Sequence, residues 1–146
     1  MKILSLVFLL NTTFNCFAQE GKTEFAIYFG NDFTKDSVTI LINGILVAKN
    51  IKLRATMISP QNLIITQDRH NMTVQPYYEP MQTLKKLPLK NSILNLKILI
   101  NNVWRNFSFN LKEGKFLFPG YNFLEVGKSD VRVLTITQRK RGPLLL

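Results

Sequence analysis

The sequence predicts an all-β fold, a single antiparallel β-sandwich of the immunoglobulin-like or jelly-roll-like kind. Helical periodicity is almost absent, whereas β-branched and aromatic residues alternate with polar residues along most of the chain. The dipeptides Asn43-Gly44 and Asn101-Asn102 each separate two alternating runs, as tight hairpin turns do. This spacing predicts about eight or nine short strands, which is typical of a sandwich or a partly closed barrel. We favour the sandwich.

The first hairpin joins Ser37–Ile42 to Ile45–Lys49. Asn43-Gly44 favours a type I′ turn, because both central residues of that turn need a positive φ. A two-residue loop fixes the pairs that we expect, which are Ile42 with Ile45, Leu41 with Leu46, Ile40 with Val47, and Thr39 with Ala48.

The second hairpin joins Ser92–Ile100 to Val103–Asn110. One face is almost wholly apolar and the other is mixed, which is typical of a sheet that covers a core on one side. Arg105 is the exception on the apolar face, and we expect it at the rim of the sheet unless the register is shifted by one residue. The pairs expected on the apolar face are Leu94 with Phe109, Leu96 with Phe107, Ile98 with Arg105, and Ile100 with Val103.

The other alternating runs predict the remaining strands. The segment Tyr77–Lys90 lacks a strand pattern, and we expect it to cross between the two sheets. The remaining predicted strands are Glu24–Phe29, Ile51–Met57, Asn62–Gln67, Met72–Gln75, Lys115–Phe118, Tyr121–Val126 and Val131–Gln138.

Residues 1–18 have the pattern of a cleaved signal peptide, which leaves residues 19–146 as one domain. Lys2 is followed by an apolar run and then by Cys16-Phe17-Ala18, with small residues at the positions that signal peptidase reads. The run is too short to span a bilayer. Two alternatives are a lipoprotein anchored at Cys16 and a buried first strand, and both fit the pattern less well.

Charge and cysteine content limit the classes of function. Residues 19–146 keep all but one of the 19 basic residues and all nine acidic residues, so their net charge is near +9. Such a surface attracts nucleic acid, lipopolysaccharide, acidic polysaccharide or anionic lipid without sequence preference. The alternative, which we favour slightly, is that the charge serves only solubility. The only cysteine, Cys16, leaves with the signal, so we expect no disulfide, thiolate metal ligand or cysteine nucleophile. The sequence contains no cofactor fingerprint, so we expect no cofactor.

Three segments carry a resemblance to a group of proteins. The hairpin Lys35–Gly44, the turn Glu113–Phe116 and the closing strand Leu134–Lys140 resemble small exported β-sandwich proteins of Bacteroidota-type bacteria, as does Phe17-Ala18-Gln19 at the expected cleavage site. The resemblance implies the fold and an envelope compartment, and it carries over no functional residue. The end of the chain, Gly142-Pro143 followed by Leu144–Leu146, departs from it.

Catalytic chemistry has few candidates in this sequence. Asp68-Arg69-His70 contains the only histidine, but no serine lies in a nucleophile elbow, so we expect a polar turn there. Asp32 and Asp36 flank one loop and fit turn chemistry as well as they fit paired carboxylates. One histidine without mature cysteines makes a metal site improbable.

Adjacent tyrosines mark the first binding candidate. Tyr77 and Tyr78 lie between prolines on a predicted loop, where they would stack on sugar rings or bases. The lysines that follow, Lys85, Lys86 and Lys90, would add positive charge. The alternative, which we favour, is that one tyrosine plugs the end of the sandwich beneath the loop.

The only tryptophan marks the second candidate. Trp104 and Leu99 face each other on the mixed side of the second hairpin, with Lys97 beside them. An exposed tryptophan on a sheet is a common contact for carbohydrate or protein. The alternative, equally weighted, is that the Tyr77–Lys90 loop or the C-terminal tail covers it.

A basic cluster ends the last strand. Arg139, Lys140 and Arg141 would contact phosphate or anionic lipid, and the three leucines that follow would enter a membrane surface. We favour a frayed, solvated terminus instead.

These observations predict a non-enzymatic binding module, located in the periplasm or outside the cell. Its expected partner is an anionic or carbohydrate component of the envelope. The alternative is an accessory subunit that binds another exported protein through an edge strand or the apolar C-terminus. An unrecognised hydrolase ranks third.

Overall fold

A computed structural model describes residues 23–54, 62–126 and 129–143. In these residues the chain forms ten strands and no helix, so the predicted all-β class is confirmed. No helix in the described part is long and apolar enough to cross a membrane. Three parts of the sequence analysis lie outside the described residues: the expected signal peptide with Cys16, the end of the expected strand Ile51–Met57, and Leu144–Leu146.

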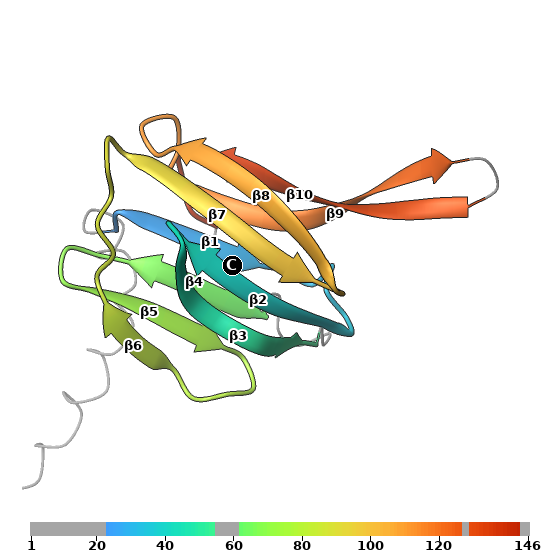
Figure 1. Ribbon diagram of the computed structural model, residues 1–146, viewed down its shortest axis with the longest axis horizontal. Coiled ribbons are helices and arrows are strands. Elements are labelled where there is room, and N and C mark those ends of the chain that lie inside the picture. Colours follow the sequence, from blue (N-terminus) through green and yellow to red (C-terminus); the bar gives the residue numbers. More distant parts are fainter. Residues whose placement is uncertain (1–22, 55–61, 127–128, 144–146) are drawn as a thin grey trace, which may run out of the picture.

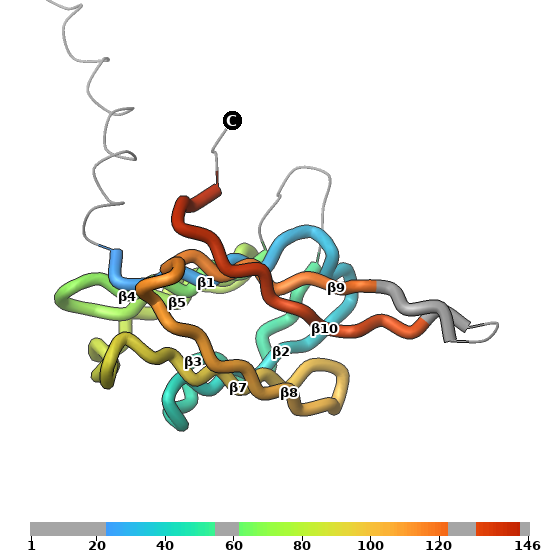
Figure 2. The backbone as a smooth tube through the Cα atoms, turned by 90° about the horizontal axis from the view of Figure 1, so that it is seen from above, coloured from blue at the N-terminus to red at the C-terminus, as the bar shows by residue number. Residues whose placement is uncertain are grey.

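The strands form two sheets that lie in two layers (Figures 1 and 2). The six-stranded sheet has the order β10-β9-β1-β4-β5-β6, with bounds Ser129–Arg139, Phe116–Val126, Phe25–Phe29, Leu63–Gln67, Asn71–Pro76 and Gln82–Lys85. The four-stranded sheet has the order β3-β2-β7-β8, with bounds Ile45–Leu53, Asp36–Ile42, Ile93–Ile100 and Val103–Asn110.

The register of the first hairpin is correct at the turn and wrong beyond it. Ile42 pairs with Ile45 and Leu41 pairs with Leu46, as predicted, but Ile40 pairs with Ala48 instead of Val47. Irregularities on both sides of Ile40 place extra residues in β3 and displace the expected Thr39–Ala48 pair. Asn50 has a φ of 54° there, and its backbone N–H donates to the hydroxyl of Thr39 at 3.0 Å.

The second hairpin has the predicted register throughout. Leu94, Leu96, Ile98 and Ile100 pair with Phe109, Phe107, Arg105 and Val103. Asn101 and Asn102 have φ values of 49° and 64°, which a type I′ turn requires. Arg105 is exposed because β8 is the edge strand of its sheet. It therefore lies at the rim, as expected, and the register is not shifted.

Four predictions about the strands are wrong. β3 runs without interruption to Leu53, although the sequence predicts two separate strands there. Likewise, β9 continues through Pro119, where the sequence predicts a break between two strands. This proline is tolerated because β1 pairs with β9 only at Phe116 and Leu117, so no ladder bond to β1 is lost. That β1–β9 pairing is parallel, so the fold is not purely antiparallel. β6 forms within Tyr77–Lys90, because the edge of β5 supplies its backbone partners, and the chain crosses between sheets after it.

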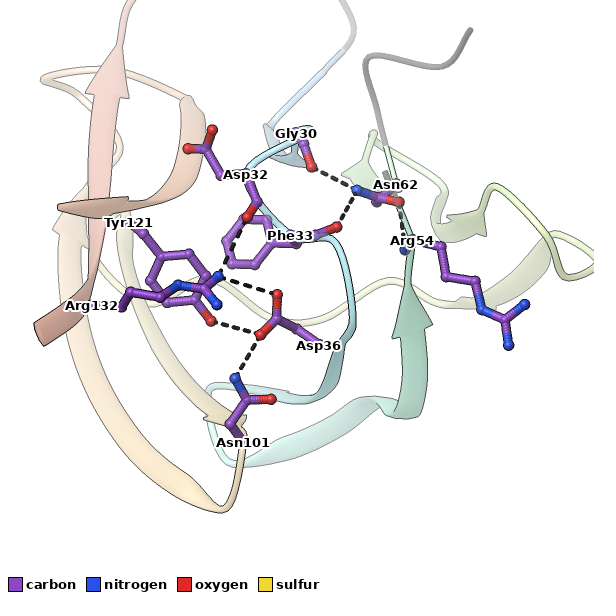
Figure 3. A network of polar contacts seen from close by, with 9 residues as sticks. All are labelled: Gly30, Asp32, Phe33, Asp36, Arg54, Asn62, Asn101, Tyr121 and Arg132. Atoms are coloured by element: carbon purple, nitrogen blue, oxygen red, sulfur yellow. Dashed lines mark hydrogen bonds and ion pairs between the residues drawn. The ribbon is translucent and has the colours of Figure 1, made fainter. Parts of the chain in front are cut away.

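The core lies between the two layers and is aromatic and aliphatic. The phenylalanines Phe25, Phe29 and Phe33 are fully buried, and Phe29 and Phe33 contact each other with ring centroids 5.3 Å apart. Asn62 closes one end: its side chain donates to the carbonyl oxygens of Gly30 and Phe33 and accepts from the backbone N–H of Arg54 (Figure 3). A buried amide is stable there because all its hydrogen bonds are made inside the protein.

Candidate functional site

The second hairpin presents the exposed tryptophan that the sequence singles out. Trp104 is 43% exposed, so neither the 77–90 segment nor the described end of the chain covers it. It pairs with half-buried Leu99 on β7. The Nζ atom of Lys97 lies 4.8 Å from the centroid of the indole ring, a cation–π distance.

This surface continues across the four-stranded sheet. Leu41 pairs with Lys97 on one side and with Leu46 on the other, and Leu46 is 51% exposed. Lys97 pairs in turn with Asn106. Directly paired residues point to the same face of a sheet. One outward surface therefore combines apolar, aromatic and cationic side chains, and we call it the Trp104 face, which consists of Leu41, Leu46, Lys97, Leu99, Trp104 and Asn106.

The exposed charges of the four-stranded sheet are all positive. Lys49, Lys52, Lys97 and Arg105 are exposed, and none of them has an ion pair among the described residues. The single acid on these strands, Asp36, is only 4% exposed and points inward. The sheet therefore presents an attractive potential to an anionic chain.

Asp36 is the centre of a polar network between the two sheets (Figure 3). Its Oδ1 atom accepts hydrogen bonds from the Asn101 amide at 2.6 Å and from the Tyr121 hydroxyl at 3.2 Å. Its Oδ2 atom lies 3.5 Å from the Arg132 guanidinium, which also stacks 3.9 Å from the centroid of the Tyr121 ring. Burial, together with the charge of Asp36, raises the pKa of Tyr121 to about 12.

A small pocket of about 120 Å³ lies beside this network, between β8 and the β9–β10 hairpin. Arg105 and Arg132 line it together with Val103, Tyr121 and Leu134. Val103 and Arg105 belong to the inward-facing side of β8 but are exposed, because β8 is an edge strand and the layers are open to solvent there. The sequence does contain a signal for Asp36: it lies in phase with Val38, Ile40 and Ile42, whose side chains face the core.

Tyr77 and Tyr78 are exposed, so the favoured interpretation of a buried plug is wrong. Each is 51% exposed, and their rings meet edge to face with centroids 4.7 Å apart. They occupy the loop between β5 and β6, in the six-stranded sheet. Lys85 is exposed on β6, opposite Asn71. The structure therefore does not unite this pair with Trp104, which lies in the other sheet.

Lys86 has a structural role in the described chain. Its ammonium group forms an ion pair with Glu24, which also accepts a hydrogen bond from the side chain of Gln67. Burial opposes ionisation of Glu24, but the hydrogen bonds from Lys86 and Gln67 prevail and hold its pKa below the usual value.

The basic cluster begins within an ordered strand, so the frayed terminus is wrong for its first residue. Arg139 pairs with Phe116 at the end of β10, and its guanidinium lies 4.9 Å from the centroid of the Phe118 ring. Lys140 and Arg141 follow and are exposed. Arg139 belongs to the six-stranded sheet, whereas the Trp104 face lies on the four-stranded sheet in the other layer (Figure 2).

The segment Asp68-Arg69-His70 forms the expected polar turn. The Asp68 carboxylate accepts the backbone N–H groups of His70 and Asn71 at 2.7 and 2.8 Å, and these bonds lower its pKa. The carboxylate therefore orients backbone rather than the imidazole ring. Across the described ranges, no group of three or more histidine, cysteine, aspartate or glutamate residues could hold a metal ion.

Comparisons with protein-family models, with curated proteins and with solved structures found no match.

Proposed function

We propose that this protein is an exported β-sandwich, immunoglobulin-like or jelly-roll-like, that binds an anionic or carbohydrate component of the cell envelope without catalysing a reaction. The contact surface is the Trp104 face. The observation that carries the proposal is the exposed indole of Trp104 with the ammonium of Lys97 beside it, on a sheet whose exposed charges are all positive.

The chemistry of this face suits a saccharide chain. The C–H groups of a sugar ring pack on the indole plane and on leucine side chains, while the amine of Lys97 and the amide of Asn106 reach its hydroxyl groups. The Trp104 face extends across neighbouring strands of one sheet, so it can contact several successive rings of a polysaccharide. Positive charge at Lys49, Lys52 and Lys97 raises the local concentration of an anionic chain before contact.

The test is a binding comparison between Trp104→Ala and Tyr77→Ala, measured by calorimetry with a panel of neutral and acidic polysaccharides. Both substitutions remove an exposed aromatic ring, but only the first lies on the Trp104 face. Trp104→Ala is expected to weaken binding about tenfold, which equals ~1.4 kcal/mol. Tyr77→Ala is expected to leave binding unchanged. Equal effects of the two substitutions would contradict the assignment of the site.

The edge strand β8 favours a second candidate, an accessory subunit that pairs with another exported protein. β8 has eight residues, one charge, no proline and a regular register with β7, so its outer edge lacks the usual protection against strand addition. By contrast, β3 is irregular and carries Lys49 and Lys52, and β6 has only four residues. A complex with another envelope protein that survives high salt would favour this candidate, because the attraction of an anionic saccharide to a cationic face weakens with salt.

A further inference from the structure

The pocket between β8 and the β9–β10 hairpin has an excess of positive charge. Arg105 and Arg132 both line it, no acid is among the described residues that line it, and Asp36 contacts Arg132 from beside it. Arg105 is exposed and has no ion pair among the described residues. The side chain of Arg132 is 41% exposed. With one carboxylate against two guanidinium groups, the pocket has a local charge of about +1.

Among the described residues, Asp36 forms its ion pair with Arg132 and none with Arg105. The carboxylate is 3% exposed and faces the Asn101 amide, the Tyr121 hydroxyl and the Arg132 guanidinium. Among the described residues, Arg105 therefore keeps its donors free for a group that enters from solvent.

The apolar residues around the pocket increase the strength of such a contact. Val103, Ile100 and Leu134 line it beside the two arginines, and Leu134 is buried. A partly enclosed wall of this kind lowers the local dielectric, so a charge pair is stronger there than on an open surface. Arginine also presents paired N–H groups that match the two oxygens of a carboxylate or sulfate.

We infer that this pocket binds the carboxylate or sulfate group of an acidic saccharide, with Arg105 as the main contact and Arg132 as its support. The inference rests on the proposed function and names the class of saccharide. Arg105 follows Trp104 directly on the edge strand β8, so a chain that lies along this edge meets the indole on one face and the guanidinium on the other.

The experiment compares oligogalacturonate with its methyl ester, which has the same rings and stereochemistry without the negative charges. Binding to the purified protein is measured by calorimetry. The native protein is expected to prefer the acid by about tenfold, equal to ~1.4 kcal/mol. Arg105→Gln is expected to reduce the acid-to-ester affinity ratio to between about one and three, because the charged contact with the carboxylate is lost. The substitution should not disturb the core, because Arg105 is exposed. Arg69→Gln, which removes an exposed arginine from the β4–β5 turn, keeps the native ratio.

Salt identity separates an oxoanion site from general attraction. Sodium sulfate at the ionic strength of a sodium chloride control is expected to weaken binding of the acid more than chloride does, because sulfate competes for the pocket. Equal weakening by both salts, or an unchanged acid-to-ester ratio in Arg105→Gln, would overturn the inference.

The two proposals fail in different ways. If Trp104→Ala leaves binding of both oligosaccharides unchanged while Arg105→Gln removes the preference for the acid, the Trp104 face is wrong and the anion pocket stands. If Trp104→Ala weakens both and Arg105→Gln changes neither, the Trp104 face stands and the pocket is wrong.

Discussion

The Asp36 carboxylate, at the start of β2, lies 3.5 Å from the Arg132 guanidinium on β10 and thereby connects the two sheets. The Tyr121 hydroxyl and the Asn101 amide complete the contact. This network lies beside the pocket at the open side of the fold, where β8 has no further strand to cover it. We therefore expect it to hold the β7–β8 turn and the β9–β10 hairpin in place around the pocket.

Asp36→Asn is expected to lower the free energy of unfolding by about 2 kcal/mol. The substitution keeps the shape of the side chain but removes the buried charge that faces Arg132. The loss is smaller than for a fully buried pair, because Arg132 is partly exposed. Chemical denaturation measures it. Asp32→Asn is the control: its side chain is exposed, so a loss as large as that of Asp36→Asn would contradict the role of the network.

Tyr121 makes stability sensitive to alkaline pH. Its pKa of about 12 in the folded protein exceeds the usual value of 10.0, so folding favours the neutral phenol. The resulting stabilisation is complete below pH 10 and is lost as the pH rises through about 12. A pH titration of tyrosinate absorbance measures the ionisation of Tyr121 as a late step near pH 12. Tyr121→Phe should abolish the step and cost about 1 kcal/mol at neutral pH. If the late ionisation step persists in Tyr121→Phe, it belongs to another tyrosine and the prediction is wrong.

Glu24 and Lys86 make stability sensitive to acid. The folded state lowers the pKa of Glu24, so the unfolded chain binds more protons below the usual value of 4.5. Stability from this pair is present above that pH and falls as the pH drops through the folded pKa. Both side chains are partly exposed, so the contribution is below about 1 kcal/mol. Thermal unfolding between neutral and acid pH should show a shallower decline for Glu24→Gln, and parallel curves would exclude the pair as a cause.

Gly114 is expected to tolerate no side chain. A Cβ atom there would lie 2.6 Å from the backbone oxygen of Arg139, and neither backbone can yield without moving the end of β10. Gly114→Ala should therefore lower the free energy of unfolding by about 2 kcal/mol, a typical loss for overpacking. A matched substitution, Gly44→Ala, has nothing within 4 Å of the new Cβ atom but a φ of +80°. It should cost about 1 kcal/mol, so a larger loss at Gly44 than at Gly114 would contradict the predicted clash.

Local sequence predicts the hairpins of this fold well and its long-range pairings poorly. Asn43-Gly44 and Asn101-Asn102 determine their own turns, so the registers next to them are correct. The irregularity of β3 depends on the contact between Thr39 and Asn50, which alternation does not reveal. The parallel pairing of β1 with β9 joins residues far apart in the chain, so no local turn sequence predicts it.

The same division holds for the candidate site. Alternation along the second hairpin places Trp104, Leu99 and Lys97 on one face, and the structure agrees. The ion pair of Asp36 with Arg132 joins strands of different sheets, so the alternation within a single hairpin contains no signal for it. The exposure of Tyr77 and Tyr78 depends on whether other segments cover their loop, which is a tertiary property.

Trp104 is the only tryptophan in the sequence, so its fluorescence reports whether the Trp104 face contacts the ligand. The purified protein is titrated with oligogalacturonate, lipopolysaccharide, dextran and DNA at low and high salt. We expect a saturable change in Trp104 emission with a saccharide, and weaker binding at high salt if that saccharide is acidic. Calorimetric binding of the same ligand without any change in Trp104 emission would place the contact elsewhere and contradict the claim.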